Sequence, residues 1–246
     1  MPYNARTNWR NNDIVTPDDL NRIEKGIAES ASPDASISFY VSPSGDDTAG
    51  TGEQGNPFKS IQKAIDSFPS NNALGKSYTI ELEEGNYTGF RLAAFKAITI
   101  NVSGQVSITG NVTISEGRLT FMGDAEASVT VVNGRIAMGG GDLTAMISLG
   151  VTYTDIVSTA NAIDCSSGAK FTSTSDVIVA NFKTAVRCAY SHIHLKRLLT
   201  DVITTGIVCE CGIVQIGDDV IQASTKFITQ QGGRIYVGSQ TNMPNY

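Results

Sequence analysis

The chain has 246 residues, enough for one or two domains. It carries 18 basic and 24 acidic residues, a net charge of −6, which argues against a nucleic-acid partner bound through bulk positive charge. The sequence has no apolar run near the ~20 residues of a membrane span and no secretory signal peptide at its polar N-terminus, so we expect synthesis in a reducing cytoplasm and no membrane insertion. The 4 cysteines lack the spacing of a disulfide framework or a zinc site, so we expect free thiols, no metal and no cofactor.

Residues 1–36 are dense in charge and predict a helical segment for attachment or oligomerisation. Thr16 can cap a helix that starts at Pro17, and Asp19 completes a short capping box. Three apolar residues then share one stripe: Leu20, Ile23 and Ile27. Because a helix of about four turns is marginal alone in water, the stripe must pack either on the body of the chain or on copies from other chains, and we favour the copies.

Residues 37–246 predict a second domain that opens with a strand, a loop and a helix. Residues 39–41 suit a short strand, and the Gly/Asp/Thr-rich loop at 42–55 lacks the ligand spacing of an EF-hand, so we interpret it as a surface turn. Pro57 is expected to open a helix over 57–68. Its apolar face consists of Phe58, Ile61, Ile65 and Phe68.

The C-terminal half repeats itself with a nearly constant period. Four similar triplets start at intervals of 22, 21 and 21 residues, at Lys170, His192, Ile213 and Arg234. Three short strands per repeat predict an all-β fold, a single-stranded right-handed parallel β-helix (a β-solenoid) of about eight coils, with a sandwich or barrel as the alternative. Side chains alternate along a strand, so we place four middle residues of the triplets inward: Phe171, Ile193, Val214 and Ile235.

Two parts of the sequence resemble known families. The strings FYVSPSG, NPFKSIQKAIDSFP and EEGNY resemble the first segment of pectate-lyase-like right-handed β-helix proteins, especially phage tail spikes and fibres, in which a helix caps the first coil. The string NWRNNDIVTPDDLNRIEKGI is similar to the N-terminal segment of tail-fibre and baseplate proteins from phages of Gram-positive bacteria.

These resemblances imply a homotrimeric virion protein of the phage tail, assembled in the cytoplasm of the bacterial host. Its N-terminus would attach to other tail or baseplate proteins, and its β-helix would contact a host-surface polysaccharide or another tail protein. Two alternatives stay open because this fold hosts many functions. One is a polysaccharide depolymerase, a glycoside hydrolase or lyase, and the other is a structural tail or collar component without a ligand.

The outward residues of the triplets are the candidate ligand-binding residues. Hydrogen-bonding groups beside an aromatic ring suit a sugar, and the set comprises Lys170, His192, His194, Gln215, Arg234 and Tyr236. The alternatives are an ordinary solvated face or one buried between protomers, and burial would explain the outward Ile213. His192 and His194 share a face, but no third metal ligand is evident from the spacing.

Catalysis would need a pair of carboxylates at a set separation. Asp-Val-Ile recurs at Asp176, Asp201 and Asp219, which makes Asp201 and Asp219 the candidates. An Asp repeated with the coils has a simpler interpretation, in which its side chain bonds the local backbone after a turn. We therefore expect a binding protein rather than an enzyme.

Overall fold

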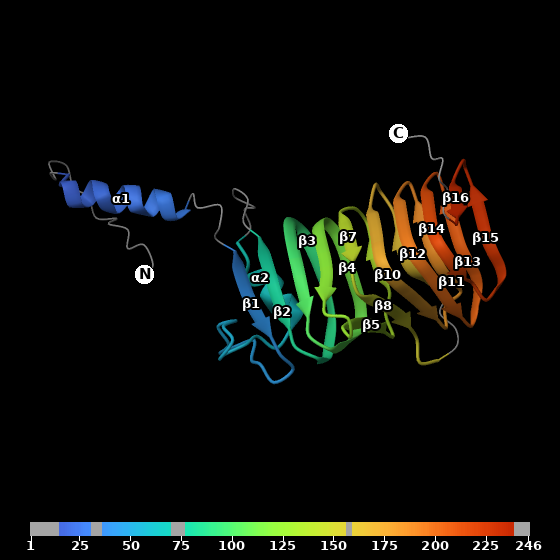
Figure 1. Ribbon diagram of the computed structural model, residues 1–246, viewed down its shortest axis with the longest axis horizontal. Helices are drawn as coiled ribbons and strands as arrows, with labels where there is room; N and C mark the ends of the chain where they lie inside the picture. Colours follow the sequence, from blue (N-terminus) through green and yellow to red (C-terminus); the bar gives the residue numbers. More distant parts are fainter. Residues whose placement is uncertain (1–14, 31–35, 70–76, 156–158, 239–246) are drawn as a thin grey trace.

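The computed structural model describes residues 15–30, 36–69, 77–155 and 159–238. Most of this part is parallel β-sheet, wound into a right-handed solenoid of about 7 turns (Figure 1). The fold class expected from the repeats is therefore confirmed, with about one coil fewer than the period suggested. The helices are α1 (Pro17–Ser30) and α2 (Ile61–Ser67). The strands are β1 (Ile37–Val41), β2 (Tyr78–Leu82), β3 (Gly85–Val102), β4 (Gln105–Gly123), β5 (Ser128–Val132), β6 (Ile136–Met138), β7 (Asp142–Ala145), β8 (Ser148–Thr152), β9 (Asn161–Cys165), β10 (Lys170–Ala180), β11 (Thr184–Ala189), β12 (His192–Asp201), β13 (Ile203–Glu210), β14 (Ile213–Val220), β15 (Ala223–Gln230) and β16 (Arg234–Val237).

Three faces run along the solenoid, and each coil contributes to them in turn. We call face A the one that carries β1, β2, the ends of β3 and β4, β7, the first halves of β10, β12 and β14, and β16. Face B holds β5, β8 and the second halves of β10, β12 and β14, and face C holds β6, β9, β11, β13 and β15. The long strands turn a corner between faces, which is why β4 pairs with β5, β6 and β7.

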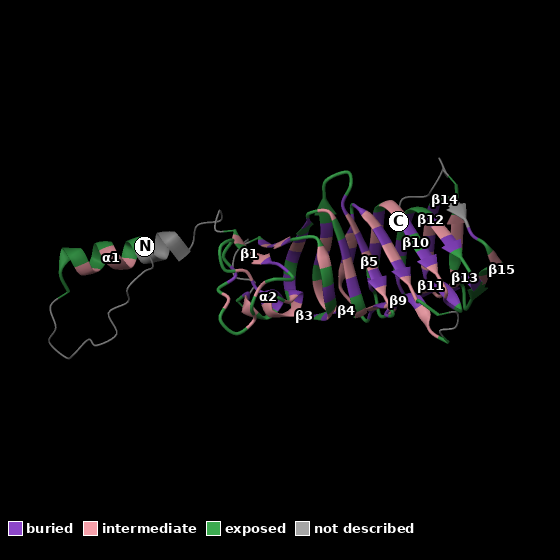
Figure 2. Ribbon diagram, turned by 90° about the horizontal axis from the view of Figure 1, so that it is seen from below, coloured by how far each residue is buried: buried purple, intermediate pink, exposed green. Residues whose placement is uncertain are grey.

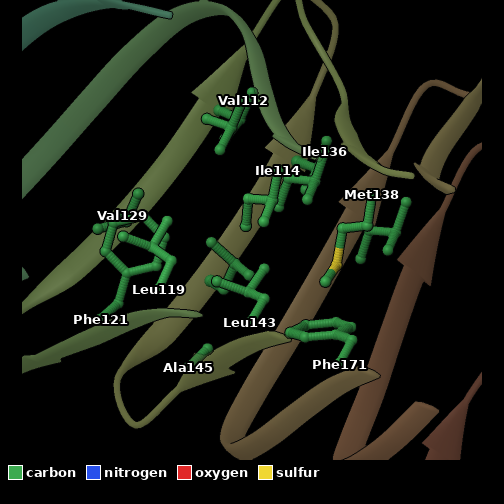
Figure 3. Packing of buried hydrophobic residues seen from close by; sticks show 14 of the residues in the cluster. Val112, Ile114, Leu119, Phe121, Val129, Ile136, Met138, Leu143, Ala145 and Phe171 are labelled. Carbon is green, nitrogen blue, oxygen red and sulfur yellow. The ribbon is translucent and has the colours of Figure 1, made fainter. Parts of the chain in front are cut away.

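The core is a set of apolar columns inside these faces, and along most strands buried residues alternate with outward ones (Figure 2). One column on face A runs in register through Leu119, Leu143 and Phe171 (Figure 3) and continues to Ile193 and Val214. All five side chains are buried. The predicted inward positions are confirmed, except that Ile235 on β16 is only half-buried, because β16 is the last described strand of face A.

Helix α2 covers the N-terminal end of the core, as predicted, and its apolar set Phe58, Ile61, Ile65 and Phe68 is buried. The expected start at Pro57 is wrong. Phe58 bonds to β1 in extended form, its N–H donating to the Tyr40 carbonyl at 2.9 Å, so the chain cannot coil there. The helix begins after Ser60, whose hydroxyl accepts from the Lys63 N–H at 3.2 Å.

The loop before this helix is held by its own carboxylates. Asp46 accepts the N–H groups of Thr48 and Ala49, and Asp47 accepts those of Lys59 and Ser60. Each carboxylate uses its Oδ1 for these bonds, which tie the loop to its own backbone and support its interpretation as a structural turn.

Helix α1 has the predicted start. The Thr16 N–H donates to Asp19 at 3.1 Å, and the Asp19 N–H donates to the Thr16 hydroxyl at 3.2 Å, which forms the expected capping box. Leu20 is 52% exposed and Ile23 is half-buried, whereas the side chain of Ile27 lies outside the described residues. Among the helices that the structure describes, none combines the length and apolar character of a membrane span.

The 4 cysteines, all within the described ranges, are free thiols. Cys165, Cys188 and Cys209 stack in register on face C and are buried, while Cys211 is half-exposed. Burial raises the pKa of the Cys188 thiol to about 12 and raises that of Cys165 further, so neither ionises near neutral pH.

Candidate functional site

A groove of about 1360 Å³ lies on the C-terminal part of face A. The first halves of β10, β12 and β14 line it together with β16. All six predicted ligand-binding residues are among its lining residues: Lys170, His192, His194, Gln215, Arg234 and Tyr236. The structure therefore gathers the whole predicted set at one place.

The strand register arranges these residues in two outward columns. The first column runs Lys170, His192, Ile213 and Arg234, and the second runs Thr172, His194, Gln215 and Tyr236. Successive members of a column are one strand spacing apart, ~4.8 Å. The surface thus offers similar positions at a regular interval. Ile213, which the sequence placed outward, is half-buried within the first column.

The second column belongs to a longer ladder that sequence reasoning missed. Five threonines precede His194 on this column in continuous register: Thr79, Thr99, Thr120, Thr144 and Thr172. Each threonine is half-buried and lies between two buried residues of its strand, the first of which is apolar. Their intervals of 20, 21, 24 and 28 residues are irregular, so a search for a fixed period passes over them.

The ladder changes character within the groove. From β12 onward, threonine gives way to His194, Gln215 and Tyr236. His194 Nδ1 and Gln215 Oε1 are 3.0 Å apart, so the ring N–H at Nδ1 donates to the amide oxygen. This bond holds the two side chains together, and a neutral imidazole then keeps Nε2 as its acceptor nitrogen.

An ion pair lies beside the groove. Arg197 lies in register between Asp176 and Asp218, and its Nε donates to Asp176 Oδ1 at 2.9 Å. The hydrogen bond and charge of Arg197 lower the pKa of Asp176, which outweighs the small opposing effect of burial. Lys196 and Asp218 line the groove beside this pair.

The three Asp-Val-Ile segments do not occupy equivalent places, so their interpretation as a third repeated element is wrong. Asp176 pairs with Arg197, whereas Asp201 is exposed at the end of β12 and pairs with Ala180. The backbone of Asp219 pairs with Leu198, and its side chain lies outside the described residues. The segments recur at intervals of 25 and 18 residues, so they cannot follow coils of about 21. Asp201 is not among the lining residues of the groove.

The two histidines lie as expected, both outward and exposed on β12. Within the described ranges, no three His, Cys, Asp or Glu side chains gather as metal ligands. The groove thus presents hydrogen-bonding groups, cations and one tyrosine ring, which suits binding of a polar ligand.

Face C carries a second feature that the sequence did not suggest. Charges of opposite sign alternate across four coils, where Asp164 meets Arg135 at 4.0 Å and Arg187 at 3.1 Å, and Arg187 meets Glu210 at 2.8 Å. The side chain of Arg187 is 32% exposed, so solvent weakens these pairs. We assign them to the register of neighbouring coils rather than to a site.

Comparison with protein-family models, curated proteins and solved structures gave no match.

Proposed function

We propose that this protein is a component of a phage tail, a trimeric fibre or spike that binds a host-surface glycan in the face A groove. One observation carries the binding role, namely the replacement of threonine by His194, Gln215 and Tyr236 within the groove, from β12 onward. A ladder that served only the fold would have no need to exchange threonine, which suits an outward strand position well.

The groove matches what a linear glycan needs. Sugar hydroxyls donate and accept hydrogen bonds, and the imidazole, amide, ammonium and guanidinium groups of the groove supply partners for both. Tyr236 adds a ring face beside them. Because the columns repeat at ~4.8 Å, a chain of similar sugar units can meet an outward side chain at each step.

The proposed phage identity rests on the N-terminal sequence and the cap segment that resemble tail proteins. The solenoid and its buried cap helix agree with that resemblance. Helix α1 has 14 residues and leaves Leu20 52% exposed, so a bundle with α1 from two further copies would remove this side chain from water. Light scattering of the full chain tests the trimer, and the mass of one chain at micromolar concentration would contradict it.

Binding is proposed in preference to depolymerisation because the carboxylates do not converge. Asp176 is held by Arg197, and Asp201 is not in the groove lining, so neither forms a pair with Asp218 across the groove. A glycosidase needs one acid poised to donate a proton opposite a second carboxylate.

The test is a glycan-binding measurement on the full chain, with glycans from candidate host surfaces and variants from the same ladder. His194→Ala and Tyr236→Ala remove groove groups, whereas Thr120→Ala changes the same column outside the groove. We expect the two groove variants to lose binding and Thr120→Ala to retain it. Equal binding by all three variants would contradict the proposed site, and release of reducing ends from the glycan would favour a depolymerase.

A further inference from the structure

We infer that the ligand of the face A groove is a linear polyanion with carboxylate or phosphodiester groups along its chain. The inference rests on the proposed glycan-binding function and narrows its ligand class. Its basis is the charge of the groove, which has the opposite sign to the charge of the protein.

Cations dominate the described lining of the groove. Lys170, Lys196 and Arg234 line it and are exposed, while Asp218 is the one carboxylate among the lining residues. The charge of Asp218 acts on Arg197, the neighbouring residue in register. Arg197 already pairs with Asp176, so Asp218 offsets at most one positive charge, and the three lining cations keep a net excess of positive charge at the groove.

The distribution of charge along the chain shows the same contrast. Residues 1–158 carry 11 basic and 18 acidic residues, a net charge of −7, whereas residues 159–246 carry 7 basic and 6 acidic residues, a net charge of +1. Clustered cations on an otherwise acidic protein attract anions locally and repel them elsewhere. This pattern favours an anionic ligand directed to one part of the surface.

The spacing of the cations favours a polymer over a small anion. Lys170 and Arg234 stand at the two ends of the first column, three strand spacings apart, about 14 Å. A single phosphate or carboxylate cannot contact both ends, whereas a chain lying along the column can place one anionic group near each. The uncharged members of the second column would then meet the hydroxyls between these groups.

Single-stranded nucleic acid is also a linear polyanion, but the groove lacks the means to hold its bases. Such binding relies on several aromatic side chains on which successive bases stack. Apart from the imidazoles of His192 and His194, Tyr236 is the one aromatic side chain on the outward columns of the described groove, because Phe171 points into the core. We therefore assign the ligand to polysaccharides and related wall polymers.

The experiment uses the full chain and four polymers of matched length. Polygalacturonate supplies carboxylates, poly(glycerol phosphate) supplies phosphodiesters, dextran is neutral, and a single-stranded oligonucleotide tests the nucleic-acid alternative. Affinity is measured by calorimetry at about 50 and about 300 mM salt. The variants Lys170→Gln and Arg234→Gln each remove one groove cation, and Lys226→Gln removes an exposed cation on β15, outside the groove.

We expect at least one of the two polyanionic wall polymers to bind more tightly than dextran and to lose affinity with salt. Each groove variant should weaken binding about tenfold, the loss typical of one charged hydrogen bond, while Lys226→Gln should change little. The preferred polymer identifies the anionic group. If dextran binds as tightly as the polyanions and Lys170→Gln has no effect, the polyanion inference is overturned and the proposed glycan binding stands. Preference for the oligonucleotide, or no binding to any polymer or host glycan, would overturn both.

Discussion

Replacing Ile193 with alanine tests the register that defines the whole site. Ile193 is 2% exposed and stands in the core column between Phe171 and Val214, whereas its neighbour His192 on the same strand is exposed. The two residues belong to opposite sides of β12. Their substitutions should therefore differ sharply in their effect on the free energy of unfolding.

The magnitude follows from the buried volume. Ile193→Ala removes three carbon groups at ~0.8 kcal/mol each, about 2.4 kcal/mol, before the cost of the cavity left behind. With the cavity, the loss should reach about 3 to 5 kcal/mol, because Phe171 and Val214 are fixed by their own strands and can close the space only partly. His192→Ala removes an exposed side chain and should cost under about 1 kcal/mol.

Circular dichroism during urea unfolding measures both losses, and hydrogen exchange locates them. Because coils of a solenoid contact only their neighbours, we expect exchange in Ile193→Ala to rise first in β12, β14 and β16 and to stay low in β2. Equal and small losses for both variants would show that the in/out register is displaced by one residue. In that case the six groove residues would point into the core, and the site would not exist.

Three further predictions concern the turns and the thiols. Val202 has φ +47° and is 46% exposed. This left-handed conformation costs a non-glycine residue about 1 to 2 kcal/mol. Val202→Gly should therefore raise the midpoint of thermal unfolding, and a lower midpoint would contradict this. Burial raises the pKa of Asp47, but hydrogen bonds from Ser60 and Lys59 lower it more. The contribution of Asp47 to stability is therefore full above roughly pH 4 and is lost below. Asp47→Asn should make the thermal midpoint less sensitive to acid, which thermal unfolding at neutral and acid pH measures. Cys211 should react with a thiol reagent in the native protein while the buried cysteines react only after unfolding, and more than one fast thiol per chain would contradict the stacking.

The period of the repeats made most of the fold predictable. Coils that stack in parallel must keep nearly the same length on each face, so equal intervals between triplets identified equivalent positions such as Phe171 and Ile193. This reasoning succeeded because inward positions tolerate few residue types and therefore leave a visible pattern.

Predictions failed where local bonds or irregular coil lengths decide the structure. The start of α2 is set by Phe58, which pairs with β1, and no helical period reveals that pairing. The threonine ladder escaped notice because the coils that hold Thr120, Thr144 and Thr172 differ in length. The Asp-Val-Ile segments gave a wrong prediction for the opposite reason, because the same three residues recur without occupying equivalent positions on the coil.

The candidate site was predictable because it depends on the same regular part of the chain. Once Ile193 and Val214 are inward, their neighbours must be outward and must stack at one strand spacing. Sequence could not show that these positions line a groove, since that depends on how β10 and β12 turn the corner near Asp176.

The solenoid explains how such a site can arise without disturbing the fold. On face A the inward residues carry the stability of the stack, and the outward residues between them are free to vary as long as they suit a strand. Five strands of face A keep threonine at this position, and three present His194, Gln215 and Tyr236 instead. The backbone register is the same in both parts, so the change of side chains alters the chemistry of the surface and not its geometry. A groove whose polar groups repeat at the strand spacing is therefore built from the same register that packs the core, and a ligand that repeats along its own length is the kind of molecule that can use every step of it.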